Sequence, residues 1–309
     1  MVGGVLFSPD PPSLSMTVTG DAALAESVRP YLAGALDRVS VATIDEGDVT
    51  YAGFGADEHT QYEIGSITKT FTALLFVDAV SRGEVTEDTR LGTLLPLEGA
   101  RVADVTLAEL ASHRSGLSKE GLRLQDAPLL VPLFLHKDPF RQDVDRVVAH
   151  ARKADLRNRG EVAYSNLGYA LLGQGLAAAS GMDYSELVRA RIFEPLGMTE
   201  SSVPTTPGYL SADAPTGYDS AGKAEAAWTM NAWAPAGGIR STTSDMARYA
   251  RALLDGTAPG MAALTPRWDY YHDGRMGYGW VTGGQGRETL TWHNGRNWRL
   301  REHSYSRSR

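Results

Sequence analysis

Ser66 and Lys69 have the residue types and the spacing of a reactive pair. They lie in residues 63–75, which read as the end of an extended stretch, a glycine at Gly65, the serine, and then a helix. Residues three apart share a helix face, so the hydroxyl and the amine can meet. The positive end of a helix disfavours a charged lysine, and burial adds to that effect, so the amine becomes a general base beside a nucleophile. The pattern predicts a serine nucleophile whose own backbone N–H is one oxyanion donor.

The helix that carries this pair is predicted from apolar residues at helical spacing after Lys69, closed by a glycine. These residues are Phe71, Leu74, Leu75, Val77, Val80 and Gly83. The same Ser-x-x-Lys pattern recurs at Ser220 and Lys223, but in a turn rich in Gly, Asp and Ser with no apolar period behind it. We interpret that second copy as a solvated loop, because only Ser66 has the extended stretch, glycine and helix that the chemistry needs.

The other elements predict an α+β protein with strands at both ends of the chain and helices between them. Helices are predicted over residues 22–36, 106–111, 143–153, 167–180, 184–193 and 244–254. Strands are predicted over residues 39–44, 49–54, 278–282 and 288–292. We divide the chain into a loose arm at 1–20, a sheet domain at 21–70 and 237–295, a mainly helical domain at 71–236, and an irregular basic tail at 296–309.

The composition is that of an ordinary globular protein, and it excludes several function classes. The chain has 309 residues, 42% hydrophobic and 22% charged, and its net charge of −7 argues against a nucleic-acid partner. It has no cysteine, which excludes disulfides and thiolate chemistry. No apolar run approaches the roughly 20 residues of a membrane span. The histidines lack metal-binding spacing, so we expect neither a metal site nor a cofactor.

The start of the sequence shows no basic segment followed by an apolar one, so no signal peptide is expected. As written, the sequence favours a cytoplasmic protein; the alternative is a true start upstream of Met1. We expect the partner to be a small-molecule or peptide substrate, and the sequence leaves the oligomeric state open.

Three short motifs resemble, in order and rough spacing, those of the serine β-lactamases and penicillin-binding proteins. They are Ser66-x-x-Lys69, Tyr164-Ser165-Asn166 and His293-Asn294-Gly295. The sequence is most similar to the class C β-lactamase branch, with its DD-peptidases and β-lactamase-like esterases. Phrases at residues 113–117, 193–198 and 236–242 also resemble that branch, and the similarity runs from about Val39 to Gly295. The resemblance implies an antiparallel sheet flanked by helices, with an inserted helical domain.

The resemblance also implies a role for each motif residue. Ser66 would attack a carbonyl and become acylated, and Lys69 would take its proton. Tyr164 would act with Lys69 as a base and later help water to deacylate the enzyme, so its pKa must fall from about 10 through cationic neighbours. Asn166 would hydrogen-bond Lys69 and the amide oxygen of the substrate. His293 would take the place of a family lysine on the strand that faces Ser66, with Gly295 completing this substrate-binding motif.

Each of these residues also has a purely structural interpretation. Ser66 resembles an ordinary helix N-cap, and Tyr164 resembles a packing residue with a solvated hydroxyl. Asn166 could cap the helix that follows it, alone or in addition to a catalytic role. His272 precedes an Asp-Gly pair and imitates the His293 motif, but it comes before the predicted strand at 278–282, whereas His293 follows it. The three motifs in order favour the catalytic interpretation.

The sequence departs from the family pattern at two places. A histidine instead of lysine at His293 is mostly neutral at pH 7, which argues against efficient β-lactam hydrolysis. After Gly295 the chain has five arginines and neither glycine nor alanine, whereas the resemblance implies a glycine-rich turn, further strands and a covering helix. A shifted reading frame would produce such a tail, and a genuine basic tail on a shortened relative is the alternative. The second oxyanion donor would fall at Arg296.

Taken together, the residues predict a serine hydrolase that forms an acyl-enzyme with an ester, an amide or a D-alanyl peptide. The alternative is a catalytically impaired relic, or a penicillin-binding protein without efficient turnover. An α/β-hydrolase is disfavoured, because the chain has no Gly-x-Ser-x-Gly sequence.

Overall fold

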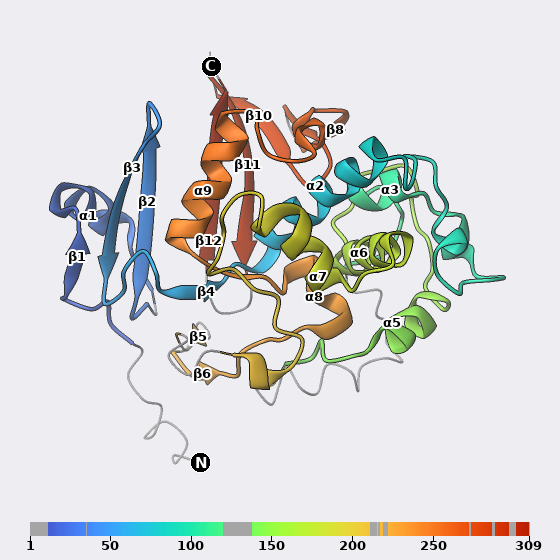
Figure 1. Cartoon of the computed structure of the whole chain (residues 1–309), viewed down its shortest axis with the longest axis horizontal. Coiled ribbons are helices and arrows are strands. Elements are labelled where there is room, and N and C mark those ends of the chain that lie inside the picture. The colour runs from blue at the N-terminus through green and yellow to red at the C-terminus, as the bar shows by residue number, and fades with distance from the viewer. Residues whose placement is uncertain are drawn as a thin grey trace, which may run out of the picture.

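Two main antiparallel sheets and a group of helices make up the fold (Figure 1). The computed structural model describes residues 12–34, 36–119, 138–210, 215, 217–218, 222–271, 273–285, 288–296 and 301–308. In Figure 1 the N-terminal sheet lies at the left, the C-terminal sheet in the middle, and most of the helices at the right. This architecture confirms the predicted α+β class.

Among the described residues, the strands pair in four groups, and all the pairings are antiparallel. The N-terminal sheet has the order β1-β3-β2, with β1 Val18–Gly20, β2 Val39–Asp45 and β3 Asp48–Phe54. The C-terminal sheet has the order β12-β11-β10-β9-β8, with β8 Trp268–Tyr270, β9 Gly274–Met276, β10 Val281–Gln285, β11 Glu288–Arg296 and β12 Arg301–Ser308. The two short pairs are β4 Gln61–Glu63 with β7 Arg240–Thr242, and β5 Gly217–Tyr218 with β6 Ala224–Glu225.

The helices fall close to their predicted positions, except for the short α8, which the sequence analysis did not predict. They are α1 Ala22–Val28, α2 Thr68–Ser81, α3 Leu107–Ala111, α5 Val144–Ala151, α6 Asn166–Ser180, α7 Tyr184–Val188, α8 Ala234–Gly237 and α9 Thr243–Leu254. Thr106 caps α3 in a reciprocal capping box with Glu109. Gly181 ends α6 with φ +68°, the left-handed value expected of a terminating glycine.

The first helix is shorter than the sequence predicted. We expected a helix over residues 22–36, but α1 ends at Val28 and a single 3-10 turn, Arg29–Tyr31, follows it. Pro30 lies in this turn, and proline ends a helix because it lacks a backbone N–H and collides with the preceding turn.

The helix α2 is buried on almost every side, not along one face. Phe71, Leu74 and Phe76 are all inaccessible to solvent, and Tyr249 of α9 stacks on Phe71 with ring centroids 4.1 Å apart. A helix that is buried all round belongs to the centre of a core. Its first turn therefore holds side chains on a rigid element, as a catalytic site requires.

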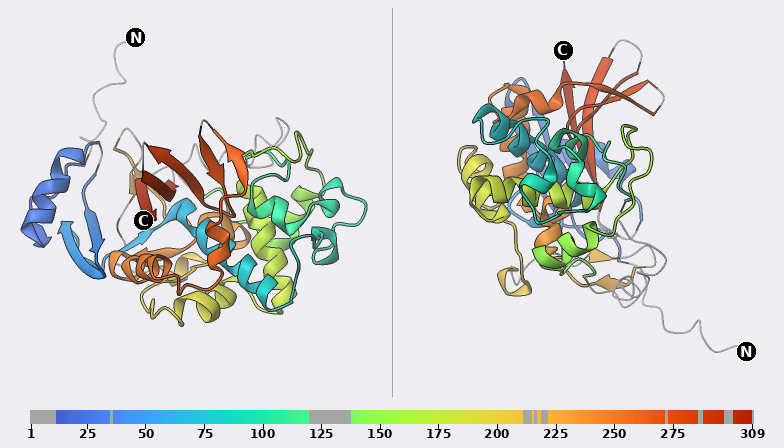
Figure 2. Two further views of the ribbon diagram at one scale, coloured as in Figure 1. Left: turned by 90° about the horizontal axis from the view of Figure 1, so that it is seen from above. Right: turned by 90° about the vertical axis from the view of Figure 1, so that its right-hand side faces the viewer.

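The strands at the two ends of the chain do not form one continuous sheet. The predicted division at 21–70 and 237–295 suggested a single sheet split by a helical insertion, but in the described ranges β2 and β12 belong to different sheets. The helix α9 lies against both β2 and β12, and Figures 1 and 2 show it beside the C-terminal strands. The two halves of the chain are joined instead by the pairing of β4 with β7.

The prediction of an irregular tail at 296–309 is wrong for the part that forms β12. Arg301–Ser308 pair antiparallel with β11, in a register that runs from Arg296 opposite Arg301 to Thr289 opposite Ser308. The pairing satisfies backbone N–H and C=O groups of β11, and a backbone ladder needs no alternation of apolar residues. Residues 297–300 and 309 lie outside the described part of the chain.

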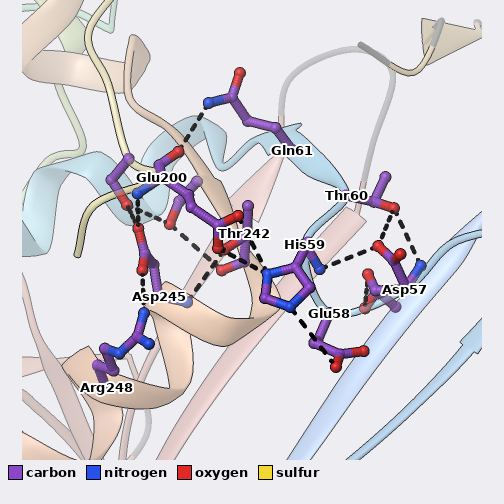
Figure 3. Close-up of polar contacts among 12 residues, drawn as sticks. Asp57, Glu58, His59, Thr60, Gln61, Glu200, Thr242, Asp245 and Arg248 are labelled. Carbon is purple, nitrogen blue, oxygen red and sulfur yellow. Dashed lines mark hydrogen bonds and ion pairs between the residues drawn. The ribbon is translucent and has the colours of Figure 1, made fainter. Parts of the chain in front are cut away.

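A polar network holds β4, β7 and the start of α9 together (Figure 3). The buried carboxylate of Asp245 accepts hydrogen bonds from the Glu200 N–H and the Ser201 hydroxyl, both at 2.8 Å. Thr242, the last residue of β7, caps α9 by accepting from the Asp245 N–H at 3.2 Å. Gln61 of β4 donates to the Glu200 carbonyl at 2.9 Å. The network therefore fixes the pairing of β7 with β4, the strand that precedes the Ser66 turn in the sequence.

The helices α6 and α8 lie so close together that even a single added methyl group should lower the stability of the fold. A methyl group on Gly173 of α6 would lie 2.2 Å from Cβ of Pro235 in α8. We expect Gly173→Ala to push the two helices apart and to lower the free energy of unfolding by about 1–3 kcal/mol, the usual cost of overpacking. Chemical denaturation of the purified variant measures this change.

Gly168→Ala in the same helix is the matched control. The nearest atoms to its added methyl group lie at 3.4 Å, which is ordinary contact. Because alanine favours a helix over glycine by up to about 1 kcal/mol, this variant is expected to be as stable as the wild type or slightly more stable. An equal loss in both variants would contradict the packing explanation.

Candidate active site

The side chains of Ser66, Lys69 and Tyr164 meet at one point. Ser66 Oγ lies 2.6 Å from the Tyr164 hydroxyl, and Lys69 Nζ donates to Ser66 Oγ at 3.1 Å. Lys69 is completely buried, whereas Ser66 and Tyr164 are partly exposed. The structure thus brings together three residues that the sequence analysis singled out for catalysis, although Tyr164 is 98 residues from Ser66 along the chain.

The turn that carries Ser66 is fixed by its backbone. Gly65 has φ +52°, a left-handed value that glycine adopts without strain, and it converts β4 into the 3-10 turn Gly65–Ile67 that leads into α2. Directly before this glycine, the Ile64 N–H donates to the Ile239 carbonyl at 3.1 Å. The predicted hinge glycine is therefore present where the strand must become a helix.

A buried ion pair supports the strands behind this turn. Arg240 of β7 donates from Nη1 to Glu63 Oε1 of β4 at 3.2 Å, and both side chains are almost inaccessible to solvent. The same carboxylate oxygen accepts from the Trp228 N–H at 2.9 Å. Burial lowers the pKa of the Arg240 guanidinium, and the neighbouring Glu63 opposes that effect. The pair links β4, β7 and the segment around Trp228 into one support.

The amine of Lys69 is oriented by neutral groups. Besides Ser66 Oγ, its Nζ donates to the Ala236 carbonyl of α8 at 2.5 Å. It also lies over two aromatic rings, 4.8 Å from the centroid of Tyr164 and 5.8 Å from that of Tyr169. Ring faces and carbonyl oxygens both attract an amine. Together they hold Nζ toward Ser66 in a buried position.

His113 is a site residue that sequence reasoning missed. Its ring lies against those of Tyr164 and Tyr169, with centroids 4.7 Å apart in each case. Burial first, and then the nearby Lys69 and His293, hold the pKa of His113 well below its usual value, so the imidazole is neutral. The only sequence signal for His113 was the family-like segment 113–117, which it begins and to which the sequence analysis assigned no role.

The second motif is divided between a capping residue and a first helical residue. Ser165 is the N-cap of α6, because its hydroxyl accepts from the Gly168 N–H at 3.0 Å. Asn166 is therefore the first residue of the helix, and the interpretation of Asn166 as its cap is wrong. Its half-buried side chain stays a candidate for substrate binding, while its N–H donates to the Lys119 carbonyl at 2.6 Å.

His293 lies in β11, the strand that packs against the turn containing Ser66. Its Nδ1 lies 2.8 Å from the carbonyl oxygen of Asn294, and since a carbonyl only accepts, Nδ1 carries the proton and Nε2 is an acceptor. Burial, followed by the nearby Lys69, lowers the pKa of His293 to about 3. The imidazole is therefore neutral at pH 7, as the sequence analysis expected of a histidine here.

The remaining candidates lie at the edges of this site. Gly295 is in β11 two residues after His293, opposite Glu302 of β12. Arg296, the expected second oxyanion donor, is the last residue of β11. The imitating residues Ser220 and His272 lie outside the described residues.

The arrangement places the Ser66 hydroxyl within hydrogen-bond distance of both the Lys69 amine and the Tyr164 phenol, and of these three residues only Ser66 and Tyr164 are partly exposed. A hydroxyl between two such groups can give up its proton to either of them. Within the described ranges, no cluster of three or more His, Cys, Asp or Glu side chains is placed to hold a metal ion. In the same part of the chain, no helix is both long enough and apolar enough to cross a membrane.

Comparisons with known proteins place this geometry in a family. A family model described as Beta-lactamase matches residues 24–302. The chain is 28% identical over 267 residues to a beta-lactamase of Pseudomonas fluorescens, covering 78% of this chain and 68% of that protein. It is 32% identical over 149 residues to the D-alanyl-D-alanine-carboxypeptidase/endopeptidase AmpH of Escherichia coli (strain K12), covering 47% of this chain and 37% of that protein.

The solved structures agree on the fold. The chain superimposes on a class C beta lactamase from Rhodobacter sphaeroides with a TM-score of 0.72 and 19% identity, covering 93% of this chain and 89% of that one. At this level of identity the likeness shows the fold alone. Because the family model spans most of the chain, including all three motifs, the chain belongs to the beta-lactamase family.

Proposed function

We propose that this protein is a serine hydrolase that works through an acyl-enzyme on Ser66. The observation that carries the proposal is the contact of Ser66 Oγ with both the Tyr164 hydroxyl and the buried amine of Lys69. A serine that merely caps a helix needs neither contact. Membership of a family that includes beta-lactamases and a D-alanyl-D-alanine-carboxypeptidase supports the same chemistry.

Acylation begins when Ser66 Oγ attacks the carbonyl carbon of the substrate and passes its proton to the Lys69–Tyr164 pair. The carbonyl oxygen becomes negative in the tetrahedral intermediate, and we assign its stabilisation to the backbone N–H groups of Ser66 and Arg296. The bond to the leaving group then breaks. The proton held by the pair moves to the leaving group, which departs as an alcohol or an amine, and the acyl group stays on Ser66.

Deacylation uses the same groups with water as the nucleophile. A water molecule gives a proton to the pair through Tyr164, a partly exposed residue, and attacks the acyl carbon. When the second intermediate collapses, Ser66 Oγ leaves and takes the proton back. The products are a carboxylic acid and the free serine, so protons and atoms balance over the cycle.

For the substrate we propose an ester, an amide or a D-alanyl peptide. The D-alanyl peptide enters because the AmpH relative is named as a carboxypeptidase. The neutral His293 favours an ester or amide that has no carboxylate next to this histidine, since an uncharged imidazole gives a carboxylate no ionic partner. The chain spans only 37% of the AmpH relative, so the activity of that whole protein is not carried over.

Removing the nucleophile tests the function directly. Ser66→Ala is expected to lower kcat for a p-nitrophenyl ester by about 10³-fold or more, because no acyl-enzyme can form. The melting temperature should stay close to that of the wild type, because Ser66 is only partly buried and the Lys69 amine keeps the Ala236 carbonyl as an acceptor. Steady-state hydrolysis and thermal unfolding of the two proteins give both quantities.

Ser220→Ala is the control, since it alters the second Ser-x-x-Lys sequence without touching Ser66. It should behave as the wild type. Turnover by Ser66→Ala at the wild-type rate would refute the assignment. A fluorescent penicillin that labels Ser66 and is never released, without ester turnover, would instead support a penicillin-binding protein.

The low pKa of His293 predicts that a change of pH leaves the preference between anionic and neutral substrates unchanged. An ordinary histidine gains a proton as the pH falls through about 6.5. His293, with a pKa of about 3, stays neutral from pH 8 down to pH 5. The ratio of kcat/KM for an anionic ester to that for its neutral analogue should therefore stay constant within about twofold from pH 8 to pH 5.

The ratio is the quantity to measure, because protonation of the shared catalytic base cancels from it. A ratio that rises as the pH falls below 6.5 would mean that His293 becomes charged and binds the anion. The same ratio measured for His293→Gln, which cannot be protonated, supplies the reference.

A further inference from the structure

His113 is hydrogen-bonded to both sequence neighbours of Tyr164. Its carbonyl accepts from the Ala163 N–H at 2.8 Å, and its ring Nδ1 accepts from the Ser165 N–H at 3.1 Å. His113 is 2% exposed and has φ +59°, a left-handed value that is uncommon outside glycine. His113, which lies in the bend after α3, thus holds the backbone on both sides of Tyr164, the proposed base.

The His113 ring also holds the ring of Tyr164 in place. It contacts the rings of both Tyr164 and Tyr169, tilted by 33° and 44° from them. The far ring is itself anchored, because the Tyr169 hydroxyl donates to the Ala111 carbonyl at 2.6 Å. Tyr164 therefore lies against a His113 ring that itself contacts a tyrosine fixed to the end of α3. Rotation of its ring away from Ser66 would break this contact.

We propose that His113 is a positioning residue that aims the hydroxyl of Tyr164 at Ser66. The inference rests on the proposed function, because it assigns Tyr164 a part in catalysis. In this proposal His113 acts through Tyr164 and needs no contact with Ser66 or with the substrate. Proton transfer depends on the 2.6 Å distance between Ser66 Oγ and the Tyr164 hydroxyl, and a misplacement of about 1 Å can cost about 100-fold in rate.

Histidine meets the requirements of this position better than other residue types. Phenylalanine has the flat ring but no acceptor for the Ser165 N–H. Asparagine has an acceptor and tolerates a left-handed backbone, but it has no ring to stack on Tyr164. A neutral imidazole supplies both the acceptor and the ring.

The protonation state of His113 agrees with this role. Because Nδ1 accepts a hydrogen bond, the proton lies on Nε2, which is buried and has no hydrogen-bond partner among the described residues. The titratable groups around the ring are Lys69, Tyr164, Tyr169 and His293. Burial, followed by the nearby Lys69 and His293, keeps the pKa of His113 low, so Nδ1 keeps its lone pair for the Ser165 N–H.

A double-mutant cycle separates positioning from general support. His113→Asn and His113→Phe are each made in the wild type and in Tyr164→Phe, and kcat and KM for a p-nitrophenyl ester are measured for all. In the wild-type background we expect kcat to fall about 10- to 100-fold for His113→Asn, with KM within about twofold. His113→Phe should lose at least as much, and it should also melt at a lower temperature, because it leaves the buried Ser165 N–H without its acceptor.

In the Tyr164→Phe background the same His113 substitutions should change kcat by less than about twofold, because the hydroxyl that His113 aims is already gone. His150→Asn, a histidine substitution in α5 at a distance from the site, is the control and should match the wild type in both backgrounds. Since His113→Asn keeps an acceptor and tolerates the backbone, it tests the proposal even where His113→Phe does not fold.

Two outcomes would overturn the proposal. A wild-type kcat for a folded His113→Asn would show that the ring does not position the base. An equal fold-loss in both backgrounds would show that His113 supports the site without acting through Tyr164. Either result leaves the dependence on Ser66 intact, whereas activity that survives Ser66→Ala would refute the proposed function itself.

Discussion

The buried amine of Lys69 is the constraint on which the rest of the site depends. An amine taken out of water costs several kcal/mol unless the protein supplies acceptors for it. Ser66 Oγ and the Ala236 carbonyl supply them, from the turn before α2 and from α8. The helix α8 is in turn pressed against α6, whose first turn follows Tyr164. One nitrogen atom therefore couples α2, α6 and α8, and a shift of any of them changes the distance between the hydroxyl and its base.

Buried carboxylates support the segments behind the site, whereas neutral groups contact the reactive side chains within it. The carboxylate of Glu63 is met by Arg240 and a backbone N–H, and that of Asp138 is met by the N–H and hydroxyl of Thr229 and by the Met230 N–H. Each buried carboxylate ties together segments far apart in the sequence, and a satisfied polar network of this kind makes a support rigid. Removing one partner of a buried pair typically costs about 3–5 kcal/mol, so these supports resist rearrangement.

The residues that the sequence could predict are those whose geometry is local. Lys69 lies one helical turn from Ser66, so spacing alone places the two side chains together, and the apolar period after them reveals the helix. Tyr164 entered only through the family resemblance, since nothing local connects it to Ser66. His113 was missed because its hydrogen bond to Ser165 spans 52 residues, and β12 was missed because backbone pairing imposes no side-chain pattern. The separation into two sheets is likewise a long-range property.

Two neutral imidazoles beside one amine determine where protons can move. His113 and His293 both have pKa values held low by burial and by Lys69, so neither gains a proton as the pH falls through the range in which histidine usually does so. A second positive charge in this buried space would be repelled by a protonated Lys69 and would have little water to stabilise it. Under the proposed function, proton exchange is therefore confined to Ser66, Lys69 and Tyr164. In that proposal the histidines contribute shape and hydrogen bonding to the reaction, and the Ser-Lys-Tyr group contributes its acid–base chemistry.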